Sequence, residues 1–335
     1  MELLRQVHER NLVEWAADKP EVVVFSGDLT GSTEIRSFRD AYPDRFFSLG
    51  MAEQNMLSWA GGMAREGYTP FVHTFAVFIY RRALDQIEMS IAYPNLPVRM
   101  FGFLPGITTP GGVSHQAIDD IAVLRGLPNM TILETGDATD VESVLDVAHN
   151  VDGPVYVRMV RKEIPRLFPA HQRMELDKAR VVREGSDVTL VTAGITTEEA
   201  MRASAALEAR GVSIEHLHVT TLKPFSDPQI AESCAKAKYG VVTLENHTTM
   251  GGLGTCVADL MAEHGVGNRL TKLGLFDTYA HGASRDYLMK EYHLDAMSLV
   301  ESLETLMNEK FDISESELAE VRVSDFASEG QLEAL

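Results

Sequence analysis

Apolar and polar residues follow two alternating patterns through residues 1–165. Short apolar runs predict buried strands, and longer segments with one apolar face predict helices. The strands are expected at residues 21–25, 70–74, 97–103, 130–136 and 154–160, and the helices at residues 3–18, 52–66, 77–93, 114–127 and 137–150. Strands that alternate with helices of this length are typical of βαβ units around a parallel sheet.

The same alternation starts again after residue 186. Residues 166–186 are polar and show no sustained period, so they are predicted to form a linker. Strands are then expected at residues 187–194, 212–219, 239–246 and 269–276, with helices at residues 196–211, 226–238 and 256–264 and two more before residue 312. Residues 313–335 form an acidic tail. We therefore predict an α/β fold with two doubly wound domains, residues 1–165 and the smaller 187–312.

Charge and cysteine content argue against several classes of protein. The net charge at pH 7 is −19, whereas proteins that neutralise nucleic-acid phosphates are basic. The same charge disfavours anionic membrane surfaces, and no run of about 18 apolar residues predicts a transmembrane helix. Cys234 and Cys256 form no CxxC pair or metal cluster. We therefore expect a cytoplasmic protein that has no metal ligands of its own and binds neither nucleic acid nor membrane.

The most informative segment is LGMAEQNMLSWAGGMA at residues 49–64. Glu53 falls in the first turn of a predicted helix, where a carboxylate also favours the helix dipole. GMAEQNM followed by AGGMA resembles the glutamate motif of the transketolase family. That resemblance implies thiamine diphosphate as cofactor and Glu53 as the carboxyl group that holds a proton at N1′ of its aminopyrimidine ring.

The segment HTFAVFIYRRALDQ at residues 73–86 resembles the pyrimidine pocket of the same family. By that match Phe78 stacks on the aminopyrimidine ring and Phe75 lines the pocket, since a flat cationic ring is bound well by aromatic walls. Arg81 falls where relatives carry an aromatic or small residue, so we assign it no role.

Three further segments match the family by position. SGDLTGS at residues 26–32 follows a strand, where α/β folds bind ligands, and the resemblance places Asp28 and Leu29 at the cofactor and Ser32 at the substrate anion. GGVSHQAIDD contains His115, which by resemblance binds the substrate near the reacting carbon and relays a proton. The arginines at the family's two anion positions are Arg5 and Arg161, and a guanidinium fork suits phosphate and sulfonate alike.

The family's magnesium and diphosphate motif, GDG followed by an asparagine, is absent from these 335 residues. The resemblance therefore implies a pyrimidine-binding domain and a transketolase C-terminal domain that need a partner subunit carrying GDG…N. That partner is expected to hold most of the Mg²⁺ and diphosphate contacts. We also expect this chain to form a homodimer within an α2β2 assembly, a heterotetramer with its active sites between chains.

The predicted substrate pocket departs from ordinary transketolases at two positions. They carry a histidine 12 positions before the active-site histidine and an aspartate four before it, and here those positions are Phe103 and Gly111. Both family residues contact the hydroxyls of ketose donors. The resemblance thus implies two-carbon ketol transfer from a phosphorylated sugar that differs from the standard pentose phosphates.

Three alternative functions stay open on the sequence. The chain could be the β subunit of a 2-oxoacid dehydrogenase or a carboligase like 1-deoxyxylulose-5-phosphate synthase, both of which use thiamine diphosphate. It could also be a non-catalytic subunit that only scaffolds its partner. The joint presence of Glu53, Phe78 and His115 argues against the last of these.

Overall fold

The computed structural model describes residues 2–320, and its N-terminal domain is built on a seven-stranded sheet. The strand order is β12-β6-β7-β5-β4-β2-β3, and every pairing is parallel except that of the edge strand β12. The strands are β2 (Val22–Ser26), β3 (Phe46–Ser48), β4 (Thr69–Phe75), β5 (Arg99–Phe103), β6 (Thr131–Glu134), β7 (Val155–Met159) and β12 (Thr221–Lys223). The prediction of a parallel sheet is confirmed.

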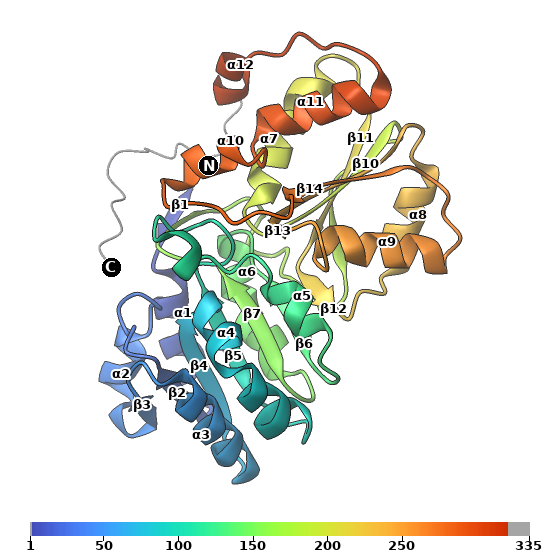
Figure 1. Cartoon of the computed structure of the whole chain (residues 1–335). Coiled ribbons are helices and arrows are strands. Elements are labelled where there is room, and N and C mark those ends of the chain that lie inside the picture. Colours follow the sequence, from blue (N-terminus) through green and yellow to red (C-terminus); the bar gives the residue numbers. More distant parts are fainter. Residues whose placement is uncertain (1, 321–335) are drawn as a thin grey trace.

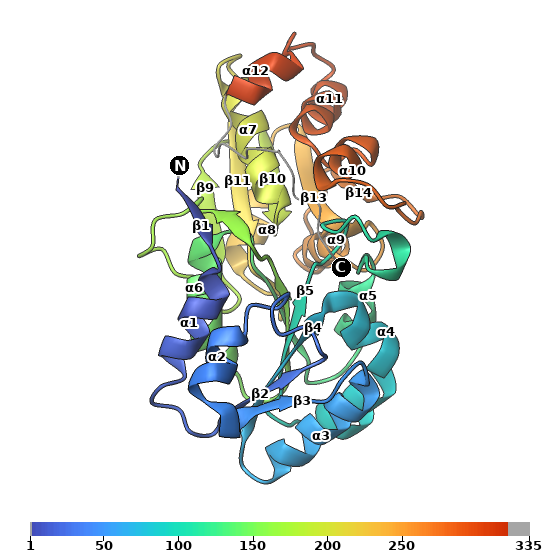
Figure 2. The same ribbon diagram turned by 90° about the vertical axis from the view of Figure 1, so that its left-hand side faces the viewer.

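Helices cover both faces of this sheet, as Figure 2 shows. One layer contains α1 (Val7–Trp15), α2 (Arg36–Ala41) and α6 (Ala138–His149). The other contains α3 (Glu53–Arg65), α4 (Ala76–Gln86) and α5 (Asp120–Arg125). Helix α4 runs directly into the π-helical segment η2 (Ile87–Ala92), which packs against α3. The short 3₁₀ turns are η1 (Pro43–Arg45) and η3 (Gly112–Ser114).

The C-terminal domain has a five-stranded sheet in the order β14-β13-β10-β11-β9. Its strands are β9 (Ala179–Arg183), β10 (Val188–Ala193), β11 (Ile214–Val219), β13 (Gly240–Thr248) and β14 (Leu270–Leu275). Its helices are α7 (Thr196–Glu208), α8 (Pro228–Lys236), α9 (Leu253–Glu263), α10 (Arg285–Glu291), α11 (Ala296–Met307) and α12 (Glu315–Glu320). Helices α7 and α11 pack together, and so do α8 and α9 (Figure 1). This domain is also doubly wound, as predicted.

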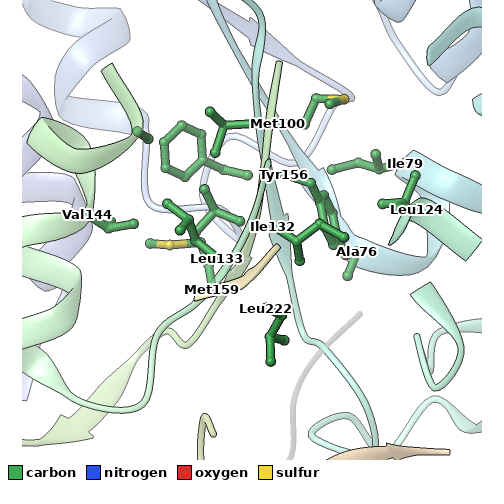
Figure 3. Packing of buried hydrophobic residues seen from close by; sticks show 14 of the residues in the cluster. Ala76, Ile79, Met100, Leu124, Ile132, Leu133, Val144, Tyr156, Met159 and Leu222 are labelled. Atoms are coloured by element: carbon green, nitrogen blue, oxygen red, sulfur yellow. The ribbon is translucent and has the colours of Figure 1, made fainter. Parts of the chain in front are cut away.

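One hydrophobic core spans the two domains, and a second core lies mainly in the C-terminal domain. Strand β12 belongs to the C-terminal part of the chain but pairs antiparallel with β6 of the first sheet. Its Leu222 is fully buried and appears in Figure 3 with Leu133, Tyr156 and Met159 of the N-terminal domain. Each Å² of apolar surface that is removed from water stabilises the folded chain by about 25 cal/mol. The shared core therefore holds the two domains in a fixed relative position.

Strand β9 lies inside the segment that was expected to be a linker. It pairs antiparallel with β11 at the edge of the second sheet. All five of its residues are only partly buried, and two of them are arginines, Arg180 and Arg183. A half-exposed edge strand of this kind lacks the continuous apolar pattern that identifies buried strands.

Two predicted helices start later in the structure. Residues 3–5 form β1 (Leu3–Arg5), which pairs with β8 (Glu163–Pro165). Gln6 adopts a left-handed conformation that separates β1 from α1, so the helix begins only at Val7. The helix expected at residues 114–127 begins only at Asp120, since the preceding loop is bound to other parts of the molecule. Within the expected acidic tail, α12 is described, whereas residues 321–335 lie outside the described residues.

Candidate functional site

Glu53 is the first residue of α3 and has only 2% of its surface exposed. Its Oε1 accepts a hydrogen bond from Nη1 of Arg82 on α4 at 2.7 Å. The positive end of the helix dipole also favours a carboxylate at this position. The structure thus buries Glu53 at a helix N-terminus, with its carboxylate directed toward α4.

Phe75, Phe78 and His115 form an aromatic cluster beside that carboxylate. The rings of Phe75 and Phe78 have centroids 5.8 Å apart, and the His115 ring lies 6.2 Å and 5.4 Å from them. Phe75 ends β4 and Phe78 belongs to the first turn of α4, so the strand-to-helix connection places both rings. Nδ1 of His115 lies 2.9 Å from Oγ of Ser114. The structure brings together residues that were predicted from two separate motifs.

The contacts of the Arg82 guanidinium show what kind of group Glu53 and Phe78 can bind together. It lies 3.8 Å from the centroid of Phe78 while it donates to Glu53. A guanidinium is planar, cationic and a hydrogen-bond donor, and a protonated aminopyrimidine has the same three properties. Glu53 and Phe78 are therefore placed to hold such a ring by a charged hydrogen bond and by stacking.

The loop after β2 lies beside the same cluster because β2 and β4 are neighbours. Ser26 and His73 are register partners, and N–H of Gly27 donates to the carbonyl of His73. A Cβ on Gly27 would stand 3.0 Å from Oγ1 of Thr74, so the loop backbone passes very close to β4. Within the loop, Asp28 is exposed with a φ of 64°, and Leu29 is partly buried against the core.

Residues of α4 bind the loop that carries His115. The Tyr80 hydroxyl donates to Oδ1 of Asp119, and burial together with nearby carboxylates raises the pKa of that hydroxyl. Arg81 donates to the same Oδ1 at 3.1 Å and to the carbonyl of Val113 at 3.0 Å. Arg81 thus holds the His115 loop, a role that its position in the sequence did not suggest.

The C-terminal domain binds the other side of this loop. Oδ1 of Asn246 accepts from N–H of Ile107 at 2.9 Å, and Nδ2 donates to the carbonyl of Pro105 at 3.0 Å. Nε2 of Gln116, the neighbour of His115, donates to the carbonyl of His281 at 3.2 Å. The C-terminal domain therefore helps to position His115, although it supplies none of the predicted catalytic side chains.

A buried charge network lies beneath the loop. Arg158 of β7 is fully buried and donates to Asp120 at 2.9 Å and to Glu134 at 2.5 Å. Burial would lower the pKa of Arg158, but the two carboxylates outweigh it and raise that pKa. Arg158 also donates to the carbonyl of Asn246 at 2.9 Å. Removal of one partner from such a network costs about 3–5 kcal/mol of stability. The network therefore holds Asp120, Glu134 and Arg158 firmly in place beneath the loop.

Two of the predicted anion-binding residues, Arg161 and Arg5, lie in different surroundings. The guanidinium of Arg161 lies 5.8 Å from the Phe75 centroid, at the edge of the aromatic cluster. The Arg5 side chain is 78% exposed and its Nε binds Oε1 of Glu163 at 2.5 Å. Arg161 thus borders the predicted cofactor pocket, whereas the Arg5 guanidinium faces solvent.

Glu34 joins the segments that carry these residues. Its Oε1 accepts from N–H of Lys162 at 2.6 Å, and it lies in the same turn as Ser32. Burial raises the pKa of Glu34 to about 6, although Lys162 N–H and the charge of Arg161 oppose the shift. Its φ of 54° and its long-range contact give no signal in the sequence, and sequence reasoning missed it.

A cavity of about 620 Å³ lies between the two domains. Arg161, Pro105 and Pro110 line it from the N-terminal domain, and residues of α7, α10 and α12 line it from the C-terminal domain. Its lining does not include Glu53, Phe78 or His115. The cavity therefore adjoins the anion-binding end of the predicted site and not the cofactor end.

The two positions that depart from the family pattern differ in their surroundings. Phe103 is fully buried and packs against the rings of His8 and His73, so it is a core residue that does not line the pocket. Gly111 adjoins His115: a Cβ there would stand 2.9 Å from Cγ of the imidazole. Of the two positions, only Gly111 lies beside the predicted catalytic histidine.

Two features are missing from residues 2–320. No set of three or more His, Cys, Asp or Glu side chains there is arranged to bind a metal ion. In the same part of the chain, every helix is too short or too polar to cross a membrane.

Comparison with known proteins places both domains. Residues 3–166 match the family described as "Transketolase, pyrimidine binding domain", and residues 177–299 match "Transketolase, C-terminal domain". A solved structure described as "Split gene transketolase, inactive beta4 tetramer" superposes with a TM-score of 0.82 at 36% identity. That match covers 91% of this chain and 98% of the other.

Two similar proteins are subunits of transketolases with distinct substrates in their names. The "6-deoxy-6-sulfo-D-fructose transketolase subunit SqwH" of Clostridium sp. is 33% identical over 92% of this chain and 95% of its own length. A subunit of the apulose-4-phosphate transketolase of Actinobacillus succinogenes is 31% identical over 84% of this chain and 91% of its own length.

Proposed function

Because this chain belongs to the transketolase family, we propose that it is the pyrimidine-binding subunit of a two-chain transketolase. It would hold the aminopyrimidine end of thiamine diphosphate, and a second chain with the GDG…N motif would hold the diphosphate and Mg²⁺. The observation that carries the proposal is the joint placement of Glu53, Phe78 and His115 in a chain that lacks GDG.

Each of these residues has a definite role in the proposal. When bound, thiamine diphosphate supplies the electron sink for cleavage of a carbon–carbon bond. Glu53 holds the proton at N1′ of the ring from its buried position, and Phe78 and Phe75 stack against or border the ring. His115 donates a hydrogen bond to the substrate oxygen at the reacting carbon and moves a proton there. Asp28 and Leu29 approach the cofactor from the loop after β2.

Exposed apolar side chains support association with other chains. Met51, two residues before α3, is 79% exposed, and Trp59 within α3 is 51% exposed. Met89 of η2 and Tyr93, which follows η2, are also exposed, and η2 packs on α3. Large apolar side chains that are exposed on neighbouring elements are typical of protein interfaces. We propose an α2β2 assembly in the cytoplasm, in which these surfaces are covered.

The proposed substrate is a sugar with a terminal phosphate or sulfonate. Arg161, Ser32 and, at longer range, Arg5 would bind the anion. One relative is named for a sulfonated sugar and another for a sugar phosphate, and a guanidinium binds both anions. Gly111 in place of the family's aspartate favours a donor other than xylulose 5-phosphate, since a lost hydrogen-bonding group changes selectivity strongly.

Calorimetry with thiamine diphosphate and Mg²⁺ tests the proposal. This chain alone should give no binding heat, the GDG…N chain alone should bind weakly, and an equimolar mixture should bind tightly at one site per pair. Tight Mg²⁺-dependent binding by this chain alone would refute the two-chain site. A pair that binds the cofactor and releases CO₂ from pyruvate, without ketol transfer between sugars, would instead favour the synthase-like or 2-oxoacid dehydrogenase alternatives.

A further inference from the structure

Arg82 makes both of the contacts that the proposed cofactor ring needs. Its Nη1 donates to Glu53 Oε1 at 2.7 Å, and its guanidinium carbon lies 3.8 Å from the Phe78 centroid. These two distances are those of a charged hydrogen bond and of a stacked cation on an aromatic ring. One side chain thus occupies the carboxylate and the aromatic face together.

We infer that Arg82 competes with the aminopyrimidine ring for Glu53 and Phe78 and so limits the cofactor affinity of the enzyme. In the unassembled chain Arg82 satisfies both groups, and it must leave them when the cofactor binds. The inference rests on the proposed function, because it takes thiamine diphosphate as the ligand of this site.

Arg82 and a stacked cofactor ring would use the same two groups, Oε1 of Glu53 and a face of Phe78. Phe78 already has the rings of Phe75 and His115 as neighbours at 5.8 Å and 5.4 Å, so a further stacked group needs the position of the guanidinium. Glu53 is 2% exposed, and within residues 2–320 the hydrogen bond that its side chain accepts comes from Arg82. A cofactor ring that stacks on the face of Phe78 held by the guanidinium and bonds to Oε1 of Glu53 therefore has to displace Arg82.

Arg82 is able to leave. Its side chain is 43% exposed, so the guanidinium can turn into solvent and regain water as hydrogen-bond partner. Glu53 cannot do the same, and a buried carboxylate without a donor is costly. The backbone beside Arg82 is also irregular: Ala83 has φ −130° and ψ 27° inside α4, and the π-helical η2 follows. Such irregular turns occur often at functional sites in helices.

The exchange links Arg82 to the stability of the free chain as well as to cofactor affinity. While the chain is alone, the Arg82 contact keeps the Glu53 carboxylate paired. After cofactor binding, the ring nitrogen takes over that pairing. Removal of Arg82 should therefore destabilise the free chain and strengthen cofactor binding in the assembled enzyme, two effects of opposite sign.

The first experiment measures cofactor affinity in the reconstituted pair by calorimetry with Mg²⁺ present. R82Q should bind thiamine diphosphate roughly two- to five-fold more tightly than wild type, the range for loss of a partly exposed ion pair. The matched control is R65Q, an exposed arginine of α3 that does not contact the cluster, and it should leave the affinity unchanged. Equal or weaker binding by R82Q would overturn the inference.

A second experiment uses the free chain, so that it does not depend on the partner. R82Q should lower the midpoint of urea unfolding, and the double variant E53Q/R82Q should recover it, because a glutamine at position 53 needs no charged partner. Equal midpoints for wild type and R82Q would contradict the claim that Arg82 pairs a buried carboxylate. Failure of the wild-type pair to bind the cofactor would instead refute the proposed function, and the two failures can be told apart.

Discussion

Asn246 of the second domain binds the backbone of Ile107 in the first, with 2.9 Å between Oδ1 and the amide nitrogen. A Cβ on Gly106 would stand 2.1 Å from Oδ1 of Asn246, so the two segments approach as closely as a glycine allows. The loop that is held in this way continues to His115. A residue of the C-terminal domain thus positions the loop of the proposed catalytic histidine.

Substitution of Asn246 should loosen that loop. N246A leaves the buried amide of Ile107 without its partner and removes one of the two hydrogen bonds to the carbonyl of Pro105, which keeps that from Thr108. The free energy of unfolding should fall by about 2 kcal/mol. Hydrogen exchange should speed up at residues 105–118. The control N268A removes a side-chain hydrogen bond to Ala237 elsewhere in the domain. Unchanged exchange at residues 105–118 in N246A would mean that Asn246 does not restrain the loop.

The two arginines of the anion site should differ in effect. R161A should raise KM for an anionic sugar roughly ten-fold, the loss expected for a charged hydrogen bond. R5A should raise it less than about three-fold, because the exposed Arg5 side chain already pairs with Glu163. Steady-state kinetics of the pair with the donor sugar, and with the same sugar without its anion, is the measurement. An equal effect of R161A on both sugars would argue against anion binding.

A methyl group at position 111 should disturb His115. Gly111 has ordinary right-handed backbone angles, so G111A causes no backbone strain, but its Cβ would lie 2.9 Å from the imidazole. We expect kcat/KM to fall roughly ten- to a hundred-fold, as displaced catalytic groups typically cost. The control G267A adds a methyl group where no atom lies within 4 Å. Wild-type kinetics in G111A would show that His115 does not need its present position.

Glu34 should make stability depend on pH. Burial raises its pKa from 4.5 to about 6 in the folded chain, so between these values the folded state keeps a proton that the unfolded state loses. The free energy of unfolding should therefore fall by about 2 kcal/mol in total as pH rises through and beyond this range, with about 1.3 kcal/mol of the loss between pH 4.5 and 6. E34Q should lack this part of the slope, which urea unfolding at several pH values measures. Parallel pH profiles for E34Q and wild type would contradict it.

The periodic part of the fold could be predicted from the sequence. Runs such as residues 22–25 and 188–193 are buried on both sides in the parallel sheets, and buried strands carry a continuous apolar pattern. Strand β12 has only three residues, and its place at the edge of the other domain's sheet depends on long-range contacts. No local pattern encodes such contacts.

The candidate site was predicted in part for a similar reason. Glu53 and Phe78 could be proposed from the sequence because their motifs are local in the chain. Arg82 lies in the same motif, but its pairing with Glu53 needs α3 and α4 side by side. Phe103 was expected in the pocket from its position in the family pattern, and its ring turns into the core between His8 and His73.

The central claim is that Glu53 holds the proton of the cofactor ring, and exchange of the cofactor C2 proton against D₂O tests it most directly. NMR of the reconstituted pair with bound thiamine diphosphate gives the rate for wild type, for E53Q and for E66Q, a control glutamate at the exposed end of the same helix. The account predicts wild-type exchange in E66Q and exchange slowed roughly 10²- to 10⁴-fold in E53Q, the usual contribution of a positioned acid–base group. Wild-type exchange in an E53Q pair that has bound the cofactor would contradict it.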